Sequence, residues 1–408
     1  MGPSPQWAEG GGGRGCWTVR PLVYVHSEAT DAAIRRFVHR GSDQSLLYEH
    51  VLSPLASWLV EWLPRWMAPN LVTLVGLCFP LSAALIFAWH CPALDCTAAP
   101  RWPHLYGAAA ILIYQTFDNM DGKQARRTKS SSPLGMLFDH GCDAINCVLL
   151  VVSIPGCVLS AGHNDLPTLL GLLMTSFTPF FFSTWDHYTR GQFVLPPING
   201  PNEGLVCAAL LGVCSWWHGV EWWWRSPWEG DGDGEVEPRP WRRIELLWAV
   251  SYFGQVVTAL AQLALAARSI RAATGRLAPF GGALLNLLPH ALVLACAIVW
   301  IHCAPDVPRR HPRDVLLLCG CAHVEICTSM MHCLMTELPY SRSHLSLLPL
   351  GIVAVSAAVG WHLSAGVVRA LVVGSCARTV LCYAQTAKHS AGALGIGVFR
   401  IRTKEATQ

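Results

Sequence analysis

The sequence Phe117-Asp118-Asn119-Met120-Asp121-Gly122-Lys123-Gln124-Ala125-Arg126 is followed, after eight residues, by Gly135-Met136-Leu137-Phe138-Asp139-His140-Gly141-Cys142-Asp143. Asp118 and Asp121 are three residues apart, a spacing that places both on one face of a helix. Asp139 and Asp143, four residues apart, share a face in the same way. Four carboxylates that converge from two adjacent helices repel one another unless cations balance them. Because the ligands are hard oxygens, we expect Mg²⁺ or Mn²⁺ rather than zinc, with two ions for the four charges.

Small and basic residues accompany these aspartates. Gly122 lies one helical turn after Asp118, and Gly135 lies one turn before Asp139. Residues without a side chain leave room for a bulky ligand to reach the metal. Arg126 adds positive charge beside the same faces. Metal ions, a basic group and close access to the backbone together suit a pyrophosphate.

A structural role for the aspartates is the alternative. Asp118 and Asp121 alone could cap helices at a loop. Asp139 and Asp143 cannot be explained in this way, because the chain continues from them directly into the apolar run 145–152. We therefore favour a ligand site.

The composition indicates a membrane protein. Charged residues make up 13% of the 408 residues, against ~25% in soluble proteins, and 52% are apolar. The net charge of +3, without a long basic run, excludes a typical nucleic-acid binder. Most of the 17 cysteines lie in apolar stretches, where we expect small buried side chains rather than a disulfide framework.

Apolar windows of about 20 residues predict ten membrane-spanning helices. The windows are 71–90, 105–117 running on toward 127, 134–160, 168–185, 204–220, 244–267, 281–303, 314–336, 346–361 and 365–387. The expected fold class is therefore an all-α integral membrane protein.

An amphipathic segment precedes the first window. It has Trp58, Trp62 and Trp66 on one side and charged residues between its apolar positions, which is typical of a helix lying in the headgroup layer. The expected divisions of the chain are a tail (1–44), this interfacial helix (45–69), catalytic helices (70–220), a polar loop (221–243), C-terminal membrane helices (244–390) and a second tail (391–408).

The aspartate pattern resembles the signature of the CDP-alcohol phosphotransferases at every fixed position: Asp118-x2-Asp121-Gly122-x2-Ala125-Arg126-x8-Gly135-x3-Asp139-x3-Asp143. Three further stretches resemble the eukaryotic choline/ethanolamine phosphotransferase branch, namely 64–73, 138–143 and 195–204. The resemblance spans about residues 45–400, and ten helices agree with that branch rather than with shorter six-helix relatives.

The resemblance implies that diacylglycerol, or its ether-linked analogue, attacks CDP-choline or CDP-ethanolamine, so that CMP leaves and phosphatidylcholine or phosphatidylethanolamine forms. Expected metal ligands are Asp118, Asp121, Asp139 and Asp143. Expected contacts to the CDP moiety are Asn70, Gly122, Ala125, Arg126 and Gly135. Which of the two alcohols is preferred stays open.

The general base has two candidates. A carboxylate bound to a divalent cation is a weak proton acceptor, whereas a histidine is suited to base catalysis near neutral pH. We therefore expect His140 to be the base ahead of Asp143, the alternative being that His140 only forms a hydrogen bond at the start of a helix.

Most of the residues expected to bind the headgroup lie where this chain departs from the family pattern. Where that branch has Trp-Glu-Glu-Tyr, this chain has Trp185-Asp186-His187-Tyr188. We expect Asp186 and Glu203 to face the cationic amine, with Trp185 or Tyr188 offering a ring face or anchoring at the membrane interface.

The resemblance also implies a homodimer in the endoplasmic reticulum or Golgi membrane, with the active site facing the cytosol. The distribution of Lys and Arg favours cytosolic termini. Two alternatives stay open: a related enzyme that makes an inositol, glycerol-phosphate or serine lipid, and a membrane transporter.

Overall fold

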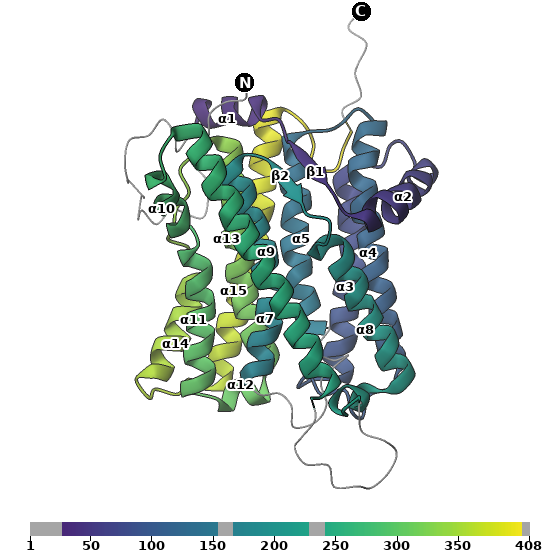
Figure 1. The fold of residues 1–408 in the computed structure, drawn as a ribbon, viewed down its shortest axis with the longest axis vertical. Coiled ribbons are helices and arrows are strands. Elements are labelled where there is room, and N and C mark those ends of the chain that lie inside the picture. The colour runs from purple at the N-terminus through teal and green to yellow at the C-terminus, as the bar shows by residue number, and fades with distance from the viewer. Residues whose placement is uncertain (1–26, 154–165, 228–240, 402–408) are drawn as a thin grey trace, which may run out of the picture.

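The computed structural model describes residues 27–153, 166–227 and 241–401, which form a bundle of long helices with one small sheet (Figure 1). The N-terminal half contains α3 (Pro69–His90), α4 (Trp102–Arg127), α5 (Pro133–Ser153), α7 (Leu166–Arg190) and α8 (Leu205–His218). The C-terminal half contains α9 (Arg243–Thr274), α10 (Ala278–Leu285), α11 (Leu288–Cys303), α12 (Asp306–Arg310), α13 (Pro312–Thr336), α14 (Leu347–Ala358) and α15 (Ala365–Leu394). A 3-10 turn, η5 (Val220–Trp224), follows α8.

Each predicted apolar window overlaps a helix within the described residues, although not every one of these helices is long and apolar enough to count as a membrane span. The window 281–303 corresponds to α10 and α11, which are bent by 42° at their junction. Among the described residues, α3, α5, α9, α13 and α15 are long and apolar enough to cross a membrane, and the bent pair would make a sixth span. The chain is thus an all-α integral membrane protein. Parts of the expected windows, tails and polar loop at 1–26, 154–165, 228–240 and 402–408 lie outside the described residues.

Helix α13 forms the centre of the bundle and packs against α5, α7 and α15. Its most apolar window is 83% buried, whereas that of α9 is 6% buried, so α9 presents its apolar side chains outward, as a lipid-facing helix does. The main core joins aromatic residues of α7, such as Phe177 and Phe181, to small and sulfur-containing residues of α13.

Helix α15 comes close to α5 at Gly141. A Cβ atom at this position would lie 2.0 Å from Cε2 of Tyr383, so only glycine permits the approach. The Tyr383 hydroxyl then donates a hydrogen bond to the Phe138 carbonyl. Helix α15 runs to Leu394, beyond the expected end at 387, and stops at Gly395, whose φ is 64°.

The N-terminal segment lies across one end of the bundle. It contains α1 (Glu28–Arg36), β1 (Gly41–Asp43), the π-helical turn η2 (Tyr48–Leu52), α2 (Ser53–Leu59) and the 3-10 turn η3 (Val60–Trp62). Strand β1 pairs in parallel with β2 (Phe193–Leu195), with Gly41 opposite Phe193. The π-helical turn η4 (Gly200–Gly204) leads from β2 into α8.

The segment predicted as an interfacial helix is helical from Leu46 to Trp62 and not to residue 69. It ends there because Leu63, which precedes Pro64, has an extended backbone. Trp58, Trp62 and Trp66 are 60%, 75% and 70% exposed. Figure 1 shows α2 at the edge of the bundle, at the same end as α1 and the C-terminal end of α15.

One disulfide bond was not expected from the sequence. It joins Cys91, which ends α3, to Cys96. The other cysteines of the described residues are free, and several of them, including Cys319 and Cys327, are buried as expected.

Candidate metal and substrate site

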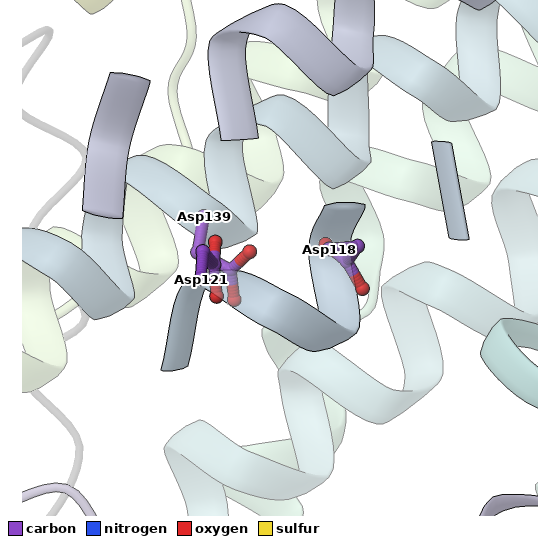
Figure 2. A group of neighbouring side chains, drawn as sticks. All are labelled: Asp118, Asp121 and Asp139. Carbon is purple, nitrogen blue, oxygen red and sulfur yellow. The ribbon is translucent and has the colours of Figure 1, made fainter. Parts of the chain in front are cut away.

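Three of the four aspartates lie together between α4 and α5. One carboxylate oxygen each from Asp118, Asp121 and Asp139 lies within 4.8 Å of the others. Figure 2 shows Asp118 and Asp121 one turn apart on α4, with Asp139 of α5 beside Asp121. The predicted spacing therefore produces the predicted convergence.

Asp143 lies one turn further along α5, beside Asp118. It is not among the three residues whose oxygens cluster most tightly. Its Oδ1 atom accepts a hydrogen bond of 2.6 Å from the hydroxyl of Tyr114 on α4. The aspartate spacing did not reveal this partner, although Tyr114 stands one turn before Asp118.

The carboxylate environment fits a divalent cation. Oδ1 of Asp118 and Oδ1 of Asp139 are buried and have no hydrogen-bond partner. Burying a charged oxygen without a donor or a cation is unfavourable, so these two atoms are suited to metal coordination. Oδ2 of Asp121 accepts a hydrogen bond of 2.5 Å from the Thr73 hydroxyl on α3. Such a contact orients a ligand, and the sequence pattern did not reveal it.

The residues predicted to contact CDP lie around this cluster. A Cβ atom on Gly135 would lie 3.9 Å from Oδ1 of Asn70, so these two residues face each other. A Cβ atom on Gly122 would meet only the Arg126 guanidinium, at 3.7 Å, so the space beside it is open. Arg126 is exposed and Ala125 half-buried near the end of α4. The missing side chains thus leave room beside the carboxylates.

The C-terminal segment contributes to the same region. The Asn70 side-chain amide donates a hydrogen bond of 2.8 Å to the Val398 carbonyl. The Phe399 ring lies edge-on to Phe138, with ring centroids 5.6 Å apart. Residues expected only as a tail therefore hold a residue predicted to bind the nucleotide.

His140 is buried between α5 and α7. Its Nε2 lies 2.8 Å from the Thr184 hydroxyl, which itself donates to the Phe180 carbonyl at 2.9 Å. Because a hydroxyl has one proton, Thr184 accepts from His140, and Nε2 carries the imidazole proton. Nδ1 is then the proton acceptor of the ring. This arrangement suits the predicted general base.

Two further histidines lie next to His140. The ring centroid of Phe193 is 6.3 Å from that of His140 and 5.3 Å from that of His187. The His39 ring lies 5.5 Å from His187, on the side of the N-terminal segment. The β1–β2 pairing brings these residues together, which explains why the sequence alone did not connect His39 with the site.

The four predicted headgroup residues have other partners. The Arg190 guanidinium donates through two nitrogens to Asp186. Glu203 accepts from the Ser45 hydroxyl and from the Asn199 backbone at 2.8 Å. The structure therefore does not bring these carboxylates to the aspartate cluster as unpaired anions.

The two aromatic candidates are also engaged. Trp185 is 0% exposed and donates its indole N–H to the Ala283 carbonyl at 2.8 Å. The expectation that this ring anchors at the membrane interface is wrong, because α7 points it into the core. The Tyr188 hydroxyl accepts from the Tyr340 backbone at 3.2 Å.

A glutamine links the loop around η4 to the carboxylate helix. Gln115, one turn before Asp118, donates to the Pro201 and Asn202 carbonyls at 2.7 and 2.9 Å. The side chain of Asn202 donates to Asp43 at 2.7 Å. This loop is consequently held between α4 and the N-terminal segment.

A family model matches this chain across the four aspartates and His140, and several known proteins are similar to it. The family model described as CDP-alcohol phosphatidyltransferase matches residues 66–187, which include all four aspartates and His140. Choline/ethanolaminephosphotransferase 2 and 1 from Arabidopsis thaliana are each 33% identical to this chain, over 92% of it and 98% of their own length. Cholinephosphotransferase 1 from Mus musculus is 40% identical over 43% of this chain and 44% of its own length.

Proposed function

We propose, from the premise that this chain belongs to the CDP-alcohol phosphatidyltransferase family, that it transfers phosphocholine or phosphoethanolamine from the CDP-alcohol to diacylglycerol and releases CMP. The acceptor is diacylglycerol or its ether-linked analogue, an alkyl-acylglycerol. The observation that carries the proposal is the convergence of Asp118, Asp121 and Asp139 on one point between α4 and α5.

The aspartates would hold Mg²⁺ or Mn²⁺. Asp118, Asp121 and Asp139 supply the clustered oxygens, and Asp143 supplies a fourth carboxylate beside Asp118. Four negative charges balance two divalent ions, which is why we propose two. When bound, the ions would neutralise the diphosphate and the charge that develops on departing CMP.

The remaining site residues would position the CDP moiety. Gly122 and Gly135 leave space for the diphosphate, Arg126 offers an exposed positive charge, and Asn70 stands opposite Gly135. These roles follow from where the residues lie and from the family pattern that they match.

His140 would activate the acceptor. The diacylglycerol hydroxyl gives its proton to Nδ1 of His140 while its oxygen forms a bond to the phosphorus that carries the amino alcohol. The bond from this phosphorus to the CMP phosphate oxygen breaks, and CMP leaves with that electron pair. Thr184 keeps the proton on Nε2 and so leaves Nδ1 ready to accept. Asp143 is the second candidate for the base.

The membrane arrangement is part of the proposal. We infer ten crossings, with the segment 45–69 in the headgroup layer and the carboxylates toward the cytosol. The position of α1 and the end of α15 at one end of the bundle supports an even number of crossings (Figure 1). The resemblance to the choline/ethanolamine branch supports a homodimer in the endoplasmic reticulum or Golgi membrane.

Release of CMP tests this function. Purified protein in detergent is incubated with diacylglycerol, Mg²⁺ or Mn²⁺, and one CDP-alcohol at a time. We expect CMP with CDP-choline, CDP-ethanolamine or both, and none when the divalent ion is chelated. Product formation only with inositol, glycerol-phosphate or serine substrates would assign a different acceptor, and the absence of CMP with all of them would favour a transporter.

A further inference from the structure

His187 on α7 is a buried polar side chain without a hydrogen-bond partner. It is 2% exposed, and neither Nδ1 nor Nε2 has a hydrogen-bond partner. Buried polar atoms are nearly always paired, so an orphaned imidazole calls for a ligand that completes it. The mechanism described above does not use His187.

The position of His187 places it beside the reacting groups. Thr184, which binds the candidate base His140, stands three residues before His187 on α7, so both side chains lie on one helix face. Phe193 contacts the rings of both histidines. In either substrate, only an oxygen atom and two carbons separate the attacked phosphorus from the nitrogen of the amino alcohol. This nitrogen must therefore lie close to His140, within the region that His187 borders.

The charged side chains near His187 already have partners, so His187 is the group available to hydrogen-bond the substrate. Asp186 forms an ion pair with Arg190, so neither of these two residues of α7 is an unpaired charge. Glu203 is occupied by Ser45 and by the Asn199 backbone. A buried imidazole without an acidic partner favours its neutral form, which offers one donor and one acceptor nitrogen.

We propose that His187 is a specificity-determining residue that accepts a hydrogen bond from the primary ammonium of the phosphoethanolamine group, so that this chain prefers CDP-ethanolamine to CDP-choline. The quaternary nitrogen of choline carries three methyl groups and no N–H, so it cannot make this bond and leaves the buried acceptor unpaired. A site that is built to bond a polar hydrogen rejects the analogue that lacks it. The inference rests on the proposed function and adds the substrate class.

The test compares kcat/KM for CDP-ethanolamine with kcat/KM for CDP-choline in purified protein. We expect the wild type to favour CDP-ethanolamine. His187→Leu removes the acceptor, and the ratio should fall roughly 10- to 100-fold, the value of one charged hydrogen bond, through a loss confined to CDP-ethanolamine. His187→Gln keeps an acceptor oxygen and should retain most of the preference.

Control variants separate recognition from folding. His218→Gln changes an exposed histidine at the far end of α8, which stacks on Trp222, and should leave the ratio unchanged. His187→Met offers a second variant without an acceptor nitrogen if His187→Leu does not fold. A wild-type preference for CDP-choline, or equal losses with both substrates in the acceptor-free variants, would overturn the inference while the transferase function stands. Absence of CMP from both substrates in the wild type would instead overturn the function, and the inference with it.

Discussion

At the scale of single residues, the aspartates could be predicted from the sequence, but their supporting hydroxyl groups could not. The three- and four-residue spacings set a common helix face, and the structure places three carboxylates within 4.8 Å of one another. Thr73, Tyr114 and Thr184 lie in apolar stretches, where a hydroxyl gives no periodic signal. Their roles depend on which helices become neighbours, and this is decided by packing rather than by local sequence.

Thr184 provides a prediction at this scale. Thr184→Val removes the acceptor for Nε2–H of His140, so the imidazole is no longer held with Nδ1 free. We expect kcat to fall about tenfold, a part of the roughly 100- to 10,000-fold that a general base contributes, while KM for the CDP-alcohol changes little. Steady-state kinetics with a saturating acceptor measures this split.

Thr184→Ser serves as the matched control, because it keeps the hydroxyl. It should restore most of the activity. Equal activity of Thr184→Val and the wild type would show that His140 needs no such orientation, and would favour Asp143 as the base.

At the scale of elements, the long helices follow directly from the apolar windows. Helix α4 also continues past its apolar part to Arg127, as expected, and so carries the first aspartate pair. The β1–β2 pairing could not be predicted, because Gly41 and Phe193 are far apart in the sequence and each strand has three residues. The end of the interfacial helix at Trp62 could have been found from Pro64.

At the end of the bundle opposite the aspartates, one arginine hydrogen-bonds carbonyl groups near the ends of two other helices. Arg313, at the start of α13, donates to the carbonyls of Phe87 in the last turn of α3, Pro92 just after α3, and Val152 in α5, at 3.0, 2.7 and 3.2 Å. Without Arg313 these carbonyls lose a charged donor, although the Phe87 carbonyl keeps a hydrogen bond of 2.9 Å from the Cys91 backbone.

Arg313→Met should therefore destabilise the protein without altering the site. We expect a loss of about 2–4 kcal/mol from the removal of several hydrogen bonds to a charged donor, seen as a lower midpoint of thermal unfolding in detergent. Arg309→Met, at an exposed position of α12, is the control and should leave the midpoint unchanged. A normal midpoint for Arg313→Met would mean that water replaces these bonds at no cost.

At the scale of the whole molecule, the two ends of the bundle differ chemically. The carboxylates lie near the end where α4 leads into α5, whereas the Cys91–Cys96 disulfide closes the other end of α3. Disulfides persist in oxidising compartments and are rare in the cytosol. The separation of the aspartates from the disulfide agrees with the proposed orientation, in which the aspartates face the cytosol, and we propose that the disulfide lies on the opposite, lumenal side.

Labelling in sealed microsomes tests this orientation. Ser131→Cys introduces a thiol at an exposed position between α4 and α5. A membrane-impermeant maleimide should label it from outside the vesicles, whereas the peptide with Cys91 and Cys96 should be labelled only after permeabilisation and reduction. Mass spectrometry identifies the labelled peptides, and labelling of Cys96 in sealed, reduced vesicles would reverse the assigned orientation.

The central claim is that the aspartates between α4 and α5 bind the divalent ions that hold the CDP-alcohol. Titration of the purified protein with Mn²⁺, with and without CDP-ethanolamine, measures this directly by electron paramagnetic resonance. The account predicts that the nucleotide tightens Mn²⁺ binding in the wild type, because ligands that share contacts are thermodynamically coupled. It also predicts that Asp118→Asn combined with Asp139→Asn abolishes both the binding and the coupling. Unchanged Mn²⁺ binding and coupling in that variant would contradict it.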